Sequence, residues 1–167
     1  ATMTLAATTW SRLQRESLAV LNNCNRRYGF GLVNLVERNV LAHSTFAAGL
    51  SHCIGGKLSS SGSAIDHLQM CTKAYAEDPS IVEAAAHDLQ RTLELDPASD
   101  GMLAIYCFFK GFHAVQTARV AHHFWNRKGG GDKMDKMLAL GLQSDMATNF
   151  NVDIHPAAKW GRGITMD

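Results

Sequence analysis

The sequence predicts a mainly α-helical fold that gives way near its end to the start of a second architecture. Apolar residues recur at the three- and four-residue spacings of amphipathic helices until about residue 150, and no useful strand alternation precedes Val152. Beyond it, Ile154, Trp160 and Met166 are spaced by six residues. That period is typical of a parallel β-helix, in which each short side contributes one inward residue per hexapeptide.

We therefore expect two parts, a helical domain over residues 1–150 and the start of a hexapeptide-repeat solenoid over residues 151–167. A solenoid needs roughly three or more repeats before stacking buries a continuous core. The second part is shorter than that, and the sequence does not begin with Met. We therefore expect the chain to be a truncated piece of a longer protein.

The helices are expected in the following order. Thr9 can cap a first helix, which the glycines of residues 28–31 end, and a second helical run covers residues 32–41. The apolar face of the first comprises Trp10, Leu13, Leu18 and Leu21. Ser44 or Thr45 can cap a third helix. Its apolar residues are Phe46, Leu50 and Ile54.

The glycines and serines of CIGGKLSSSGS predict a loop over residues 53–63, and a fourth helix follows with Ile65, Leu68 and Cys71. Asp78 is a good N-cap for a fifth helix, and Pro79 is suited to the first position of that helix. That helix has the clearest apolar stripe, made of Ile81, Ala85, Leu89 and Leu93.

The same Asp-Pro pair recurs at Asp96 and Pro97, where a long helical stretch reaching Trp125 is expected to begin. The glycines of NRKGGGDK then break the pattern before a last helix over KMLALGLQSDMATNF. The amphipathic stretch before the break offers an interface with other subunits as one interpretation. Its stripe would comprise Phe109, Phe112, Val115 and Val120.

Composition excludes several classes of function. Lys and Arg number 16 against 15 Asp and Glu, a balance that argues against a nucleic-acid or membrane-surface partner. No stretch approaches the ~20 apolar residues of a membrane span, and the first ten residues lack the features of a secretion signal. We therefore expect a cytoplasmic protein.

The cysteines and histidines do not form a recognisable metal site. No C-x-x-C pair or H-E-x-x-H motif is present, so neither a disulfide framework nor a metal centre is expected. The cysteines are interpreted as small core residues in a reducing compartment. They are Cys24, Cys53, Cys71 and Cys107. The glycine-rich stretches match no phosphate-binding loop, so no cofactor-binding residue is assigned.

Four acidic residues are the candidates for chemistry. Asp96 and Asp100 flank the corner DPASD, and Asp153 and Asp167 bracket the segment of period six. The alternatives are structural: Asp96 can be an N-cap before Pro97, and Asp153 and Asp167 can be solvated turn residues. Spacing alone does not decide between these interpretations.

The chain resembles the serine acetyltransferase family along nearly its whole length. The strongest motifs are DPASDGMLAIYCFFKGFHAVQTARVAHHFW and VDIHPAAKWGRGITMD, which are similar to D-P-A, F-K-G-F-H-A, A-H near a Trp, and V-D-I-H-P-A-A in the family. VLAHSTFAAGLSHCIGGKL and DPSIVEAAAHDLQRTLELDP are similar to its amino-terminal helical region. The chain departs from the family at Trp160, where a smaller aliphatic residue is usual, and in GGGDKMD, which looks like an insertion.

The resemblance implies a left-handed β-helix and the transfer of acetyl from acetyl-CoA to the hydroxyl of L-serine in cysteine biosynthesis. Asp153 aligns with the carboxylate that orients the catalytic histidine, so the resemblance implies that it is the catalytic residue of this chain. Asp96 and Asp167 align with carboxylates that hold the substrate serine. The histidine follows the position of Asp167 in the family, so we expect the 167-residue chain to be inactive alone.

The resemblance also implies the partners. Acetyl-CoA is a co-substrate and not a tightly bound cofactor, and its binding residues lie further along the β-helix in the family. The family is usually a hexamer of two trimers that meet through their helical domains, so a homo-oligomer is expected. O-Acetylserine sulfhydrylase is a possible partner through the family's carboxyl-terminal tail. The alternative to an enzyme is a non-catalytic helical assembly domain.

Overall fold

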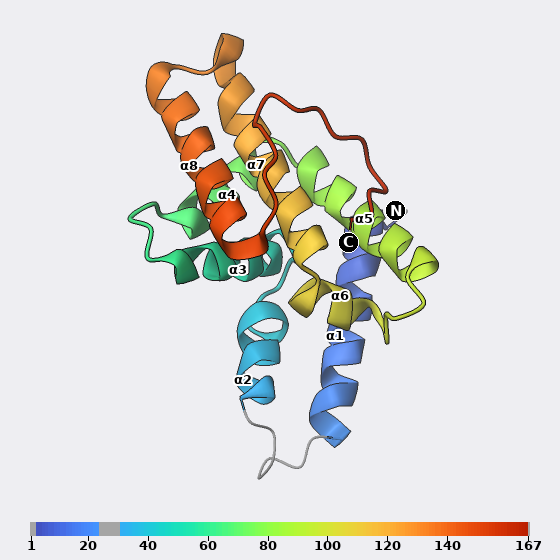
Figure 1. The fold of residues 1–167 in the computed structure, drawn as a ribbon. Coiled ribbons are helices and arrows are strands. Elements are labelled where there is room, and N and C mark those ends of the chain that lie inside the picture. Colours follow the sequence, from blue (N-terminus) through green and yellow to red (C-terminus); the bar gives the residue numbers. More distant parts are fainter. Residues whose placement is uncertain (1–2, 24–30, 167) are drawn as a thin grey trace.

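The computed structural model describes residues 3–23 and 31–166, which form helices followed by an extended segment (Figure 1). The α-helices are α1 (Leu5–Asn23), α2 (Leu32–Val36), α3 (Phe46–Leu58), α4 (His67–Glu77), α5 (Ser80–Leu95), α6 (Met102–Phe108), α7 (Lys110–Gly130) and α8 (Lys133–Phe150). A π-helical turn, Glu37–Leu41, extends α2, and a 3₁₀ turn, Ser59–Ser61, extends α3. The predicted all-helical body is confirmed.

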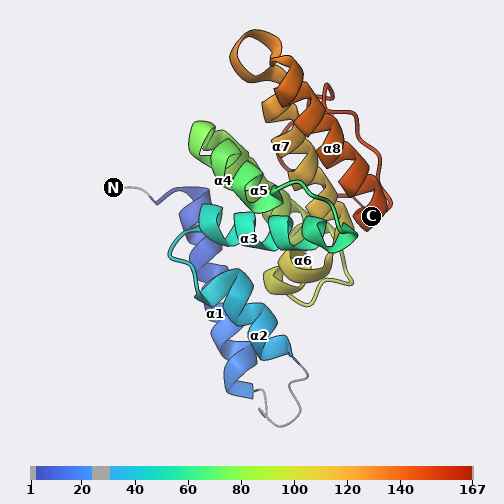
Figure 2. The same cartoon turned by 90° about the vertical axis from the view of Figure 1, so that its left-hand side faces the viewer.

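The helices form an elongated body, and the first half of α7 lies in its core. The α7–α8 hairpin lies at one end and the α1–α2 pair at the other, with α3 between them (Figure 2). Residues 111–121 of α7 are all buried. A helix that is buried on every side belongs to the core of its own chain. The stripe interpreted as a subunit interface therefore packs inside the protein, because Phe112, Val115 and Val120 are buried there.

Two predicted helix starts are wrong. α1 begins at Leu5, where Thr4 Oγ1 accepts a hydrogen bond from the backbone N–H of Ala7, and Thr9 lies buried within the helix. Leu18, expected on the apolar face of α1, is 51% exposed. The second wrong start is the one predicted at Asp96. Its N–H donates to the carbonyl of Thr92, so Asp96 ends α5 and does not begin a helix.

The loop expected over residues 53–63 is also partly wrong, because α3 continues through Gly55 and Gly56 to Leu58. A Cβ at Gly55 would lie 2.9 Å from the backbone of Leu68. Gly55 is thus required for the close approach of α3 and α4. The predicted cap at Thr45 is confirmed, since its side chain accepts from the N–H of Ala48. The cap predicted at Asp78 is displaced, because α5 begins at Ser80 with Pro79 at the N-cap position, and Asp78 Oδ1 instead accepts from the N–H of Ser80.

The segment after α8 differs from the expected start of a β-helix. Asn151, at φ 60°, ends α8 in the left-handed conformation, and no strand forms over the described residues 152–166. Ile154 is buried, and Trp160 and Met166 pack half-buried against the helical core. The six-residue spacing therefore marks the contacts of this segment with the helices, and no solenoid coil is seen. The described helices include none that is long and apolar enough to span a membrane.

Candidate functional site

The segment Val152–Met166, which contains the predicted catalytic residue Asp153, runs along α7 and then across to α5 (Figure 1). At its start, Asp153 Oδ1 accepts a hydrogen bond from Gln143 Nε2 of α8 at 2.6 Å. The ring of His155 then packs edge-on against Trp125, with centroids 5.0 Å apart. Near its end, Gly111 of α7 allows close approach, because a Cβ there would overlap the backbone carbonyl of Met166. The helices thus support the segment at several points along its length.

A buried ion pair between α5 and α7 holds the second half of this segment. Arg119 Nη2 contacts Asp88 Oδ2 at 2.5 Å, and the two side chains are 7% and 0% exposed. Gln116 Nε2 donates to the same carboxylate oxygen at 2.9 Å. Gln116 and Arg119 are three residues apart on α7, which places both on the face toward α5. A buried carboxylate requires such partners because its desolvation is costly.

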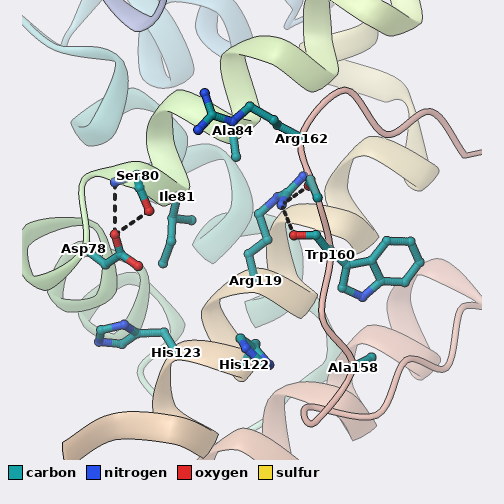
Figure 3. Close-up of a pocket in the computed structure, with 11 residues that line it drawn as sticks. Asp78, Ser80, Ile81, Ala84, Arg119, His122, His123, Ala158, Trp160 and Arg162 are labelled. Atoms are coloured by element: carbon teal, nitrogen blue, oxygen red, sulfur yellow. Dashed lines mark hydrogen bonds between the residues drawn. The ribbon is translucent and has the colours of Figure 1, made fainter.

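The same two side chains bind the main chain of the segment. Asp88 Oδ1 accepts from the backbone N–H of Ile164 at 2.8 Å. Arg119 Nη1 donates to the carbonyl of Gly161 at 2.7 Å and more weakly to that of Trp160 at 3.4 Å (Figure 3). The ion pair therefore satisfies main-chain groups that no strand or helix satisfies.

A pocket of about 300 Å³ lies between this segment, α7 and the start of α5 (Figure 3). His122 Nδ1 donates to the carbonyl of Pro156 at 2.8 Å, and His123 Nε2 pairs with Glu77 at 2.8 Å. The hydrogen bond from His123, with those from Arg127 and Lys73, lowers the pKa of Glu77 to about 2. Glu77, the last residue of α4, is thus the counter-charge of His123, Arg127 and Lys73.

The structure describes two of the three predicted site residues and does not bring them together. Asp96 is half-buried at the end of α5, and its Oδ1 accepts from the N–H of Ala98 at 2.8 Å. Asp153 is exposed beside α8, and within residues 3–23 and 31–166 its carboxylate shares no hydrogen-bond partner with that of Asp96. Asp167 lies outside the described residues. The catalytic role of Asp153 and the substrate-binding roles of Asp96 and Asp167 therefore stay predictions.

Three buried cysteines are inert thiols. Cys53, Cys71 and Cys107 are free, and burial raises the pKa of the first two to about 12 and of Cys107 to about 11. Cys24 lies outside the described residues. In the part of the chain that is described, no group of three His, Cys, Asp or Glu side chains is placed to hold a metal ion.

Sequence reasoning missed the Asp88–Arg119 pair, although a signal was present. The apolar stripe of α5 passes through Ala85 and Leu89, and Asp88 occupies the same face between them. An acid inside an apolar stripe needs a buried cation from another element. Arg119, in the helix that is buried on all sides, was the candidate to supply it.

Comparison with known proteins identifies the family. The family model for the amino-terminal region of serine acetyltransferases, "Serine acetyltransferase, N-terminal", matches residues 10–117. The serine acetyltransferase of Salmonella typhimurium is 36% identical over 159 residues, which cover 95% of this chain and 54% of that protein. The serine acetyltransferase of Haemophilus influenzae is 33% identical over 159 residues, which cover 55% of that protein.

Solved structures agree. A serine acetyltransferase in complex with CoA superimposes with a TM-score of 0.81 at 33% identity, covering 96% of this chain and 63% of the other. Soybean serine acetyltransferase complexed with serine superimposes with a TM-score of 0.82 at 31% identity, and the match covers 97% of this chain and 63% of the soybean chain. The chain spans about half the length of the curated relatives it matches. It belongs to the serine acetyltransferase family and corresponds to the amino-terminal helical region of that family.

Proposed function

We propose that this chain is the amino-terminal part of a serine O-acetyltransferase, which transfers acetyl from acetyl-CoA to the hydroxyl of L-serine in cysteine biosynthesis. The observation that carries the proposal is the match to serine acetyltransferases over 95% of the chain in sequence and 96% in structure. Solved relatives in complex with CoA and with serine support this choice of substrates.

The roles proposed for the carboxylates follow from the chemistry. A serine hydroxyl is a weak nucleophile near neutral pH and needs a positioned general base. In the family that base is a histidine after the position of Asp167, and Asp153 would orient it and stabilise its imidazolium. Asp153 suits this role because it is exposed and, among the described residues, is hydrogen-bonded through Oδ1 only, which leaves Oδ2 available.

Asp96 and Asp167 are proposed to hold the substrate serine, through its ammonium and hydroxyl groups. Asp96 is half-buried, and the N–H of Ala98 fixes Oδ1 and leaves Oδ2 available as an acceptor. A carboxylate fixed in this way is suited to bind an ammonium group, because the charge-assisted hydrogen bond loses little side-chain entropy.

The helical body is proposed to act as a platform for the first residues of a hexapeptide domain. Gln143 fixes Asp153, and Asp88 fixes Ile164 eleven residues later. The platform sets the direction in which the chain continues after Met166. The proposed domain division, at about residue 150, coincides with the end of α8 at Phe150.

The function can be tested with two polypeptides. Residues 1–167 alone are expected to release no free thiol from acetyl-CoA in the presence of L-serine, because they contain neither the base nor the coenzyme site expected from the family. The same residues fused at Asp167 to the remaining part of the Salmonella typhimurium relative are expected to show saturable, serine-dependent thiol release. A folded fusion without this activity would refute the proposed reaction. Saturable activity from the 167-residue chain would refute the role given to the following histidine.

Assembly of subunits is the second proposed function, favoured by an exposed apolar region near the α1–α2 end. A groove of about 560 Å³ between α1, α2 and α6 contains Val20, Leu32 and Phe108, and Phe108 is 57% exposed. We expect the protein to form a homo-oligomer that associates through this end of the molecule, a dimer rather than a hexamer, and light scattering measures its size. The Phe108→Ser variant should shift the protein toward monomer. A wild-type chain that is monomeric at high concentration would refute it. O-Acetylserine sulfhydrylase stays a partner predicted from the resemblance.

A further inference from the structure

A small basic pocket lies away from the acetyl-transfer residues, between the π-helical turn Glu37–Leu41 and α3. Its volume is about 190 Å³. It is lined by Leu35, Arg38, Asn39, His52, Cys53, Gly56 and Lys57. Three of these side chains are basic and none is acidic. A concave site that gathers cations without acids is suited to an anion.

Arg38 and Lys57 of this pocket have no carboxylate partner among the described residues. Five other lysines and arginines form ion pairs with carboxylates: Arg12, Lys73, Arg91, Arg119 and Arg127. Neither Arg38 nor Lys57 does so within the part of the chain that the structure describes. Arg38 is exposed and Lys57 is half-buried. Their N–H donors are therefore available to a ligand.

The positive potential of the site extends to the groups around it. Partial burial lowers the pKa of His52, and the nearby charges of His43 and Arg38 lower it further. Burial lowers the pKa of His113 to about 3, and Lys57 contributes to that shift. Cys53 adds no negative charge, because burial raises the pKa of its thiol to about 12.

Two further features make this a built site. A single π-helical turn often marks a functional position, and Arg38 and Asn39 lie on the one found here. The side-chain amide of Asn39 has no hydrogen bond within the described residues, although its backbone carbonyl accepts from the Tyr106 hydroxyl at 3.0 Å. An adjoining pocket of about 400 Å³ shares Gly56 and Lys57 and adds Lys110 on its far side.

We propose that the Arg38–His52–Lys57 pocket binds a phosphate-type oxyanion. Arg38 and Lys57 donate charge-assisted hydrogen bonds, and Asn39 and protonated His52 supply further donors. The pocket is smaller than the roughly 300–1,000 Å³ of drug-sized ligand sites, so it suits a single phosphoryl group. The anion is free phosphate or the phosphate of a larger molecule. This site is independent of the proposed acetyl transfer.

The test is a titration of the folded chain with inorganic phosphate, followed by NMR of the His52 ring at ionic strength held constant with NaCl. Saturable shifts are expected for His52, together with a higher pKa, because the bound anion offsets the neighbouring cations. Lys57→Gln and Arg38→Gln should each weaken binding by about tenfold or more. Lys133→Gln removes the same charge from an exposed, unpaired site on α8 and should leave the affinity unchanged.

Pyrophosphate distinguishes the two sources of the ligand. If the site takes the phosphate of a larger molecule, pyrophosphate should bind more tightly than phosphate, and Lys110→Gln should remove only that gain. Equal affinities indicate free phosphate. Non-saturating shifts, equal shifts in the wild type and in Lys57→Gln, or shifts at His122 and His123 without any at His52 would each overturn the proposal.

Discussion

Replacing Asp153 with Asn is expected to reduce kcat by about 10²- to 10⁴-fold in the fusion that carries a hexapeptide domain. The carboxylate would hold the catalytic histidine in the productive tautomer and stabilise its positive charge in the transition state. The Asn side chain has nearly the same shape and can still accept from Gln143, as Asp153 does at 2.6 Å. The substitution therefore removes the charge while the local contacts remain.

Steady-state thiol release at saturating acetyl-CoA, with L-serine varied, separates the effects on kcat and KM. A residue that acts in the transition state lowers kcat and kcat/KM together, whereas a residue that only binds serine raises KM. Glu94→Gln is the matched control, because it also removes one carboxylate and disturbs only exposed contacts, those with Arg91 and Gln90. A kcat within about twofold of the wild type in Asp153→Asn would contradict the assigned role.

The helices were predictable because their apolar periodicity is local information, whereas two boundaries depended on tertiary contacts. Asp78-Pro79 and Asp96-Pro97 look alike in the sequence, and in both an aspartate oxygen accepts from the N–H two residues later. After Asp78 a helix follows directly, but after Asp96 the chain turns and passes through Gly101 at φ 115° before α6 starts. Asx turns and helix caps use the same acceptor, so the dipeptide alone does not distinguish them.

The glycines of α3 were misread for a related reason. Gly and Ser content is a loop signal, but Gly55 is needed for close packing against the backbone of Leu68, and only the position of α4 reveals that need. For the candidate site, the resemblance supplied Asp96 and Asp153 as positions in a motif. The Asp88–Arg119 pair, which holds the chain after Asp153 through Gly161 and Ile164, joins two helices whose paired residues are 31 positions apart, and no local pattern predicts it.

Replacing Arg119 with Met is expected to lower the free energy of unfolding by about 3–5 kcal/mol. The substitution leaves the carboxylate of Asp88, which is 0% exposed, with Gln116 and the N–H of Ile164 as its remaining partners. It also removes the donor to the carbonyl of Gly161. Urea unfolding followed by circular dichroism measures the loss. Arg162→Met, at an exposed arginine of the same segment, should change stability by less than about 0.5 kcal/mol.

The double variant Asp88→Leu/Arg119→Met shows how the loss arises. If the cost of Arg119→Met comes from leaving a charge buried and uncompensated, removing that charge should restore much of the stability, since apolar replacements of buried ion pairs are often neutral or stabilising. The double variant should still release the segment from α5, because Ile164 N–H and the Gly161 carbonyl lose their partners. Hydrogen exchange at Ile164 should then accelerate while the helical core stays protected. Additive losses in the double variant, or an Ile164 amide that stays protected, would show that the pair does not anchor the segment.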